Sequence, residues 1–121
     1  MSTIRFNYLY RDAGNYKNWG SIVLSNQEKL PLDAARLRLR RALVDGYLFV
    51  AKQVRIPERF LFRAGFATSD DHCYHEFDGV ESTTEVPDDL HSRSIAQLLS
   101  EIERESARGW IADDPHTSPA Q

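Results

Sequence analysis

A seven-residue stretch near the start of the chain alternates between apolar and polar side chains, and it restricts the possible folds more than any other feature. The apolar side chains that share one face are Ile4, Phe6, Tyr8 and Tyr10. Alternation with a period of two, carried by aromatic residues, predicts a strand that is buried on one side. A second apolar run at residues 20–25 follows closely, so the two segments are expected to form a β-hairpin.

The connection between these two strands, residues 12–19, is longer than the usual hairpin loop of about two to five residues. It must therefore either pack on itself or present Tyr16, Lys17 and Trp19 to solvent. Aromatic side chains beside Asn and Lys at a surface are typical of binding sites. The expectation for Trp19 is that it folds under as a lid on the sheet, and the exposed arrangement is the alternative.

Two amphipathic helices are predicted. The first begins near Pro31, which suits a first helical turn, and ends before Asp45-Gly46. The second follows a capping box formed by Ser94 and Gln97, and Gly109 is placed to end it. Trp110 and Ile111 are expected to fold back as an anchor. The apolar stripes of the two helices are Leu32, Ala35, Leu39, Ala42 and Leu43, and Ile95, Leu98, Leu99 and Ile102.

Further strands are predicted between the helices. Residues 47–50 form a short apolar run, residues 60–62 fit a short buried strand, and residues 72–77 read as its partner, extended past Gly79 into residues 80–84. Gly79 indicates a bulge or bend. The fold class is therefore α+β: a mainly antiparallel sheet of about four strands with two helices on one face, in the order ββαββα. The sheet face without helices is a candidate dimer surface.

Domain organisation follows from length. A chain of 121 residues with 41% hydrophobic residues is expected to form one α+β domain over residues 1–111, followed by a disordered tail at residues 112–121. No apolar run approaches the roughly 18 to 20 residues of a membrane span. One cysteine cannot form an internal disulfide and no segment resembles a signal peptide, so a cytoplasmic location is expected.

Charge is distributed unevenly along the chain. Residues 1–66 hold 12 Lys and Arg against 5 Asp and Glu, a balance of +7, whereas residues 67–121 hold 3 against 13, a balance of −10. The expectation is that the two halves pack with opposite charges facing. The alternative is a basic surface that receives an acidic partner. The arginines on the polar side of the first helix, which such a surface would use, are Arg36, Arg38, Arg40 and Arg41.

The segment from Asp70 to Asp78 is the densest in reactive side chains. As a strand, it would direct Cys73 and His75 to the core and His72 and Glu76 to the other face. The sharper hypothesis is a metal site in a small metal-dependent hydrolase, since imidazole and carboxylate are common ligands, although the spacing matches no known ligand motif. The residues of that hypothetical metal site are Asp71, His72, His75 and Glu76.

Other chemistry is disfavoured. The acidic residues around Cys73 would raise the pKa of its thiol and so oppose nucleophilic catalysis. The six glycines are isolated, so no phosphate-binding loop and no nucleotide cofactor is implied. Nucleic-acid binding through the Arg36–Arg41 helix face is a further alternative, and the strongly acidic second half argues against a nonspecific binder of this kind.

The motifs at residues 8–20 and 71–78, with a helix between them and another after, resemble those of a group of small bacterial proteins of unknown function. The resemblance implies a free-standing bacterial protein of similar size and no particular activity. Pro31 stands where those proteins commonly have serine, so the first helix is expected to be less well capped. The leading hypothesis is a non-enzymatic, cytoplasmic module that binds or regulates a protein, with a homodimer possible. Its candidate contact residues are Tyr16, Lys17, Trp19, Arg36 and Arg40.

Overall fold

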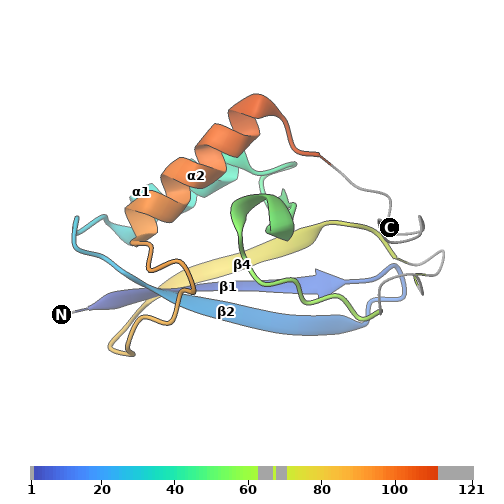
Figure 1. Ribbon diagram of the computed structural model, residues 1–121, viewed down its shortest axis with the longest axis horizontal. Helices are drawn as coiled ribbons and strands as arrows, with labels where there is room; N and C mark the ends of the chain where they lie inside the picture. Colours follow the sequence, from blue (N-terminus) through green and yellow to red (C-terminus); the bar gives the residue numbers. More distant parts are fainter. Residues whose placement is uncertain (1, 63–66, 68–70, 112–121) are drawn as a thin grey trace.

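The computed structural model describes residues 2–62, 67 and 71–111. The expected tail at residues 112–121 lies outside this part of the chain. The described strands are β1 (Thr3–Arg11), β2 (Lys17–Ser25), β3 (Leu48–Phe49) and β4 (His75–Thr83), which form one antiparallel sheet in the order β2-β1-β4-β3. The helices α1 (Leu32–Ala42) and α2 (Ile95–Arg108) lie on the same face of this curled sheet (Figure 1). The predicted α+β class is confirmed.

The centre of the sheet is β1, as its alternation requires. The four side chains of its apolar set are buried, and Ile4, Phe6 and Tyr8 belong to the hydrophobic core that the helices cover. Phe6 lies 6.0 Å from Phe49 and 5.2 Å from Phe77 between ring centroids. The hydroxyl of Tyr8 donates a 2.7 Å hydrogen bond to the carbonyl of Pro57, so its one polar group is satisfied inside the core.

The helix ends agree with the sequence. Pro31 is the N-cap of α1 and supplies no side-chain cap, whereas Ser94 and Gln97 form the expected capping box of α2. Gly109 ends α2 with a φ of 105°. The indole of Trp110 donates a 3.0 Å hydrogen bond to the carbonyl of Ala42 and so ties the end of α2 to α1. The anchor is thus confirmed for Trp110, while Ile111 stays exposed.

The fourth strand comes from the apolar run 47–50, where Leu48–Phe49 pairs with the start of β4 as that run suggested. The strand predicted at residues 60–62 is wrong, because these residues form no strand. The residue just before this segment is held by side chains and not by a strand, because the N–H of Arg59 donates to His75 and the carbonyl of Arg59 accepts from Asn18. Phe60 and Phe62 nevertheless pack on Tyr10, with ring centroids 5.1 and 5.9 Å away. Their apolar character therefore serves ring packing and not a sheet ladder.

Strand β4 begins at His75 and not at His72, so the division of the 72–77 segment between two strand faces applies only from His75 onward. The register against β1 shifts between Asn7 and Tyr8, where Gly79 and Phe77 are the opposite residues. Asp78 is the extra residue of this bulge. The bulge that Gly79 indicated is confirmed.

The hairpin loop is shorter than expected, because β2 already begins at Lys17. Residues 12–16 form the loop, and it is closed by hydrogen bonds from the N–H of Asp12 to the carbonyl of Tyr16 and from the N–H of Asn15 to the carbonyl of Asp12. Trp19 pairs with Leu9 on the sheet face opposite the helices and is 55% exposed. The expectation that it folds under as a lid is wrong, since its position in the strand directs it away from the core.

Gly20 allows β2 to pass close to the core. A Cβ atom there would lie 2.8 Å from Cζ and 2.9 Å from the hydroxyl of Tyr8, which is fully buried and held by Pro57. We expect Gly20→Ala to lower the free energy of unfolding by about 1–3 kcal/mol through overpacking. Urea denaturation measures this change.

The matched control is Gly79→Ala, since a Cβ at Gly79 would meet nothing within 4 Å. This second substitution is expected to change the free energy of unfolding by no more than about 0.5 kcal/mol. If both substitutions lowered the free energy of unfolding equally, the cause would be the replacement of a glycine in a strand and not the contact with Tyr8.

Candidate functional site

The four residues of the hypothetical metal site lie around the end of β1 and the start of β4. The segment that follows η1 (Ala51–Val54) contacts one of them, His75, through Arg59. Tyr10 connects two of these four, because its hydroxyl donates to Oδ1 of Asp71 at 2.8 Å and accepts the N–H of His72 at 3.1 Å. Nδ1 of His72 accepts the N–H of Tyr74, which leaves Nε2 to donate to the carbonyl of Arg11 at 2.7 Å. Both ring nitrogens of His72 are therefore engaged by backbone groups.

His75 is buried completely among aromatic rings. Its Nε2 accepts the N–H of Arg59 at 2.8 Å, which confirms the expected backbone partner, while its Nδ1 has no hydrogen-bond partner among the residues that the structure describes. Burial, followed by the nearby His72 and Arg59, lowers the pKa of His75 from 6.5 to about 4. The ring is therefore neutral at pH 7 and behaves as a core side chain.

The side chain of Glu76 points away from His75 and toward Arg11. Its carboxylate accepts from Nε of Arg11 at 2.8 Å. Within the described ranges, no group of three or more His, Cys, Asp or Glu side chains is arranged to hold a metal ion. The four candidate ligands are engaged by neighbours such as Tyr10, Arg11 and Arg59 and are not arranged around one point, so this geometry gives the metal-dependent hydrolase no support.

The two oppositely charged halves of the chain do face each other. On the open face of the sheet, Arg5 pairs with Glu81 and Glu85, and on the helix side Arg38 pairs with Glu103 through two bonds of 2.9 and 2.6 Å. These contacts confirm the expected packing of the basic half against the acidic half. They also remove Arg38 from the basic face that nucleic-acid binding would use.

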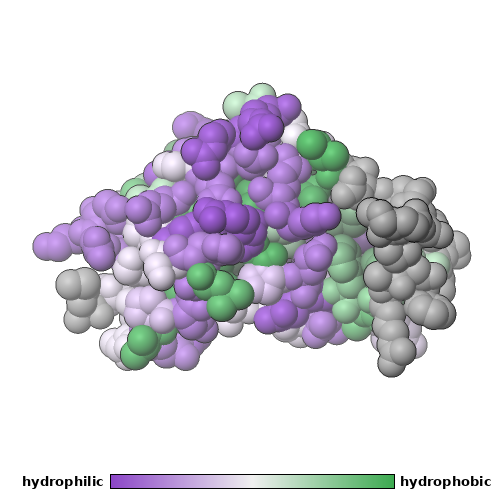
Figure 2. Space-filling view, viewed as in Figure 1, coloured by the Kyte–Doolittle hydropathy of each residue, from purple (hydrophilic) through white to green (hydrophobic). Residues whose placement is uncertain are grey.

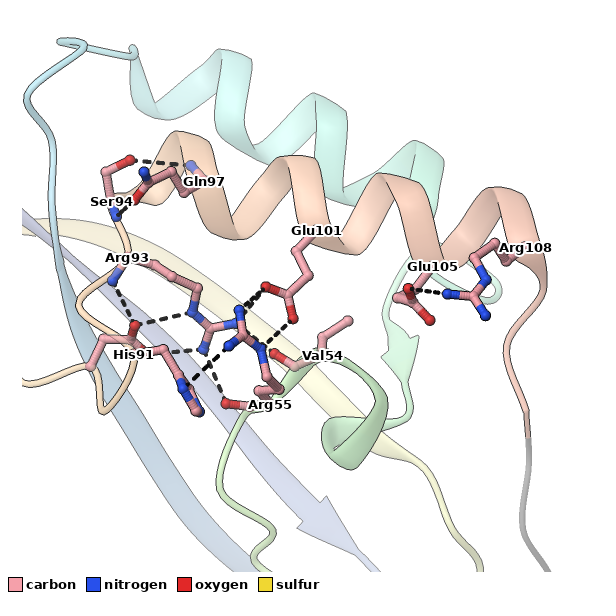
Figure 3. A network of polar contacts seen from close by, with 10 residues as sticks. Val54, Arg55, His91, Arg93, Ser94, Gln97, Glu101, Glu105 and Arg108 are labelled. Atoms are coloured by element: carbon pink, nitrogen blue, oxygen red, sulfur yellow. Dashed lines mark hydrogen bonds and ion pairs between the residues drawn. The ribbon is translucent and has the colours of Figure 1, made fainter.

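A polar network that the sequence did not reveal lies between η1 and the start of α2 (Figure 3). Arg93, only 5% exposed, donates to both carboxylate oxygens of Asp89 at 2.9 and 3.0 Å and to Glu101 at 3.3 Å. It also donates to the carbonyls of Val54 and Arg55 at 2.6 and 3.0 Å. All five guanidinium N–H groups thus have acceptors.

The outer part of this network is more exposed. Arg55 donates to both oxygens of Glu101 at 3.0 and 2.7 Å and to Nδ1 of His91 at 3.3 Å. Burial would raise the pKa of Asp89, but the bonds from Arg93 outweigh it and hold that pKa below its usual value. The bond from Arg55 likewise holds the pKa of Glu101 low, against its burial.

The network lines a surface groove of about 550 Å³ that also includes Ser100 and Arg104. The buried charged groups of the network, Asp89, Arg93 and Glu101, are paired with one another. The network therefore holds η1 against α2, and none of these three groups is left free to react. The sequence signal was weak: Asp89 and Arg93 are four residues apart, a spacing that appears in a helix but here spans a turn.

The candidate contact residues divide into two separate surfaces. Tyr16, 72% exposed, Lys17 and Trp19 lie together at the hairpin end of β1 and β2. Beside Trp19 lies an open depression of about 480 Å³, lined by Asn7, Trp19, Gly20, Ser21, Arg59 and Asp78. Arg36 and Arg40 lie on α1, where Arg36 donates to the carbonyl of Val80 at 3.3 Å.

The face that carries α2 shows no large apolar patch over its described residues (Figure 2). Figure 2 shows that the side carrying α2 is mostly hydrophilic, with hydrophobic residues in small separate groups. Among the described residues, no helix is both long and apolar enough to cross a membrane.

No family model, curated protein or solved structure matches the chain.

Proposed function

We propose that this protein is a non-enzymatic module that binds another protein through the hairpin end, defined as Tyr16, Lys17 and Trp19. The observation that carries the proposal is the position of Trp19, which is more than half exposed on the sheet face without helices and borders a depression. Tryptophan and tyrosine are enriched where binding energy concentrates in protein interfaces. The partner would be met in the cytoplasm, as the single cysteine suggests.

The hairpin end is also held in one conformation before any partner arrives. Besides the backbone bonds that close the loop, Oδ1 of Asp12 accepts the N–H of Tyr16 at 2.9 Å. Trp19 sits on a regular strand directly opposite Leu9, whose side chain is buried. A rigid aromatic pair loses little conformational entropy on binding, which favours affinity.

The alternative functions receive less support from the described residues. Arg38 is paired with Glu103, which leaves a smaller basic face on α1 for a nucleic acid. The four metal candidates contact different partners and do not converge on one point. Protein binding uses side chains that are exposed and positioned already.

The test is photo-crosslinking in cells of the organism that encodes the chain. A photoreactive phenylalanine derivative is placed at Tyr16 or Trp19, and at Val86 as a control, because Val86 is 83% exposed on a different loop. Positions 16 and 19 are expected to capture the same protein, and position 86 is not. Binding of the purified partner should fall by about tenfold or more in Tyr16→Ala and Trp19→Ala variants.

Two results would contradict the proposal. One is equal crosslinking from all three positions, which would indicate random collision. The other is a purified chain that retains no partner at physiological salt yet turns over a substrate. Circular dichroism of each variant shows whether the fold is preserved, since both side chains are exposed and their removal should leave stability almost unchanged.

A further inference from the structure

One edge of the sheet is left open among the described residues. Strand β3 covers only the first two residues of β4, His75 and Glu76, and the carbonyl of Tyr47 accepts the N–H of Phe77. Beyond Phe77, no described strand pairs with this side of β4. The opposite edge of the sheet is protected, because Asp88 exchanges bonds of 2.7 and 3.0 Å with the backbone of Val23.

The pairing pattern shows which backbone groups of β4 point outward. The backbone N–H and carbonyl of Val23 point to Asp88 and therefore away from Arg5, the residue opposite Val23 on β1. The backbone groups of Arg5 consequently point to the other side of β1, toward the backbone of Glu81 on β4. The alternate residues Val80 and Ser82 therefore direct their N–H and carbonyl groups to the open edge. The carbonyl of Val80 accepts from Arg36 there, which agrees with this assignment.

Helix α1 runs along the open edge. Leu32 and Ser82 line the same groove, and the next turn brings Arg36 to Val80. The following turn carries Arg40, whose side chain lies close to Gly46, next to the residue that bonds to Phe77. Arg40 makes no ion pair with any other described residue. The open edge is thus flanked by a row of arginine side chains.

A groove of about 520 Å³ lies at the other end of this edge, between the start of the chain, the β2–α1 loop and β4. Its apolar wall is formed by Ile4, Leu30, Pro31 and Leu32, and its polar wall includes Asn26, Gln27, Lys29 and Ser82. Ser82 pairs with Ile4, so its side chain lies on the helix face of the sheet. A residue added opposite Ser82 would direct its side chain into this groove, and the residue opposite Val80 would direct its side chain toward Arg36.

We propose that β4 receives an extended segment of a partner protein as an additional strand, with an apolar and an acidic residue two positions apart. The apolar side chain occupies the groove opposite Ser82, and the acidic side chain meets Arg36 and Arg40. Backbone bonds to the open edge supply affinity and the two side-chain sites supply selectivity. The proposal takes the chain to be a protein-binding module, as above, but uses a surface separate from the hairpin end.

The probe is a phage-displayed library of random ten-residue peptides, selected against the full chain, followed by synthesis of the selected peptides. They are expected to share an apolar and an acidic residue two positions apart, and to shift the amide resonances of Val80 and Ser82. Ser82→Pro removes an outward N–H at an edge where proline is tolerated, and should weaken peptide binding by about tenfold or more.

Arg40→Glu is expected to weaken binding by a similar factor, whereas Arg41→Glu, with the same charge change on another side of α1, should leave it within about twofold. Trp19→Ala should not change peptide binding, and Arg40→Glu should not change crosslinking at the hairpin end. Each of the two proposals can therefore be contradicted without the other. Peptides without the spacing, or binding that Arg40→Glu and Ser82→Pro leave unchanged, would overturn the proposal. So would sedimentation that shows a dimer joined through β4, because the edge would then be occupied by a second copy.

Discussion

Replacing Arg93 by methionine is expected to lower the free energy of unfolding by about 3–5 kcal/mol. The substitution removes the guanidinium but keeps a side chain of similar length, so the loss comes mainly from the polar groups left behind. Asp89 would remain buried with no guanidinium beside it, and the carbonyls of Val54 and Arg55 would lose their donor. Urea denaturation at pH 7 measures the change.

Arg38→Met is the matched control, because Arg38 also binds a carboxylate through two nitrogens but is 31% exposed at its side chain. Its expected cost is no more than about 1 kcal/mol. Combining Arg93→Met with Asp89→Leu removes the stranded carboxylate and should recover part of the loss. Equal costs for Arg93 and Arg38, or no recovery in the double variant, would mean that burial of the ion pair is not what determines its importance.

Acidification from pH 7 to pH 4 is expected to cost the fold about 3 kcal/mol through His75 alone. Because its pKa falls from 6.5 in the unfolded chain to about 4 in the fold, the unfolded chain binds more protons between these values. Stability from this group is therefore complete above pH 6.5 and is lost as the pH falls toward 4. The proton would enter Nε2 and break the bond from the N–H of Arg59.

The variant His75→Gln keeps an acceptor for Arg59 but does not titrate. The difference in unfolding free energy between the native chain and this variant should shrink by about 3 kcal/mol between pH 7 and pH 4. The pKa values of Asp89 and Glu101 are lowered from 3.8 and 4.5, so their contributions to stability begin to fall near these ordinary values, and they do so in both proteins. A difference that stays constant with pH would contradict the assignment to His75.

The parts of the fold that local sequence determines were predicted. The alternation of β1, the capping box at Ser94 and the glycine at the end of α2 each act within a few residues, so they are visible in the chain itself. The short strand Leu48–Phe49 was not distinguished from residues 60–62, because both are brief apolar runs. The difference between them lies in contacts with β4: Phe49 pairs with the backbone of His75, whereas Arg59, next to residues 60–62, donates to the His75 side chain.

The candidate sites depended on contacts between distant residues, and prediction was correspondingly weaker. The density of residues 71–76 suggested chemistry, but those side chains turn to separate partners such as Tyr10 and Arg11. The network around Arg93 joins residues 54, 89 and 101, which no short pattern connects. The exposure of Trp19 depends on where β2 begins. The sequence pattern predicts a strand from residue 20, whereas β2 begins three residues earlier, at Lys17.

The central position of β1 has a consequence for synthesis. Of the described strands, β1 leaves the ribosome first, and its hairpin partner β2 follows directly. Its other neighbour, β4, pairs Thr3 with Thr83, and α2 comes later still. The hairpin must therefore wait with its aromatic face uncovered until most of the chain has been translated. Such non-local closure is slow and leaves an interval in which aggregation competes with folding, or in which a chaperone would bind.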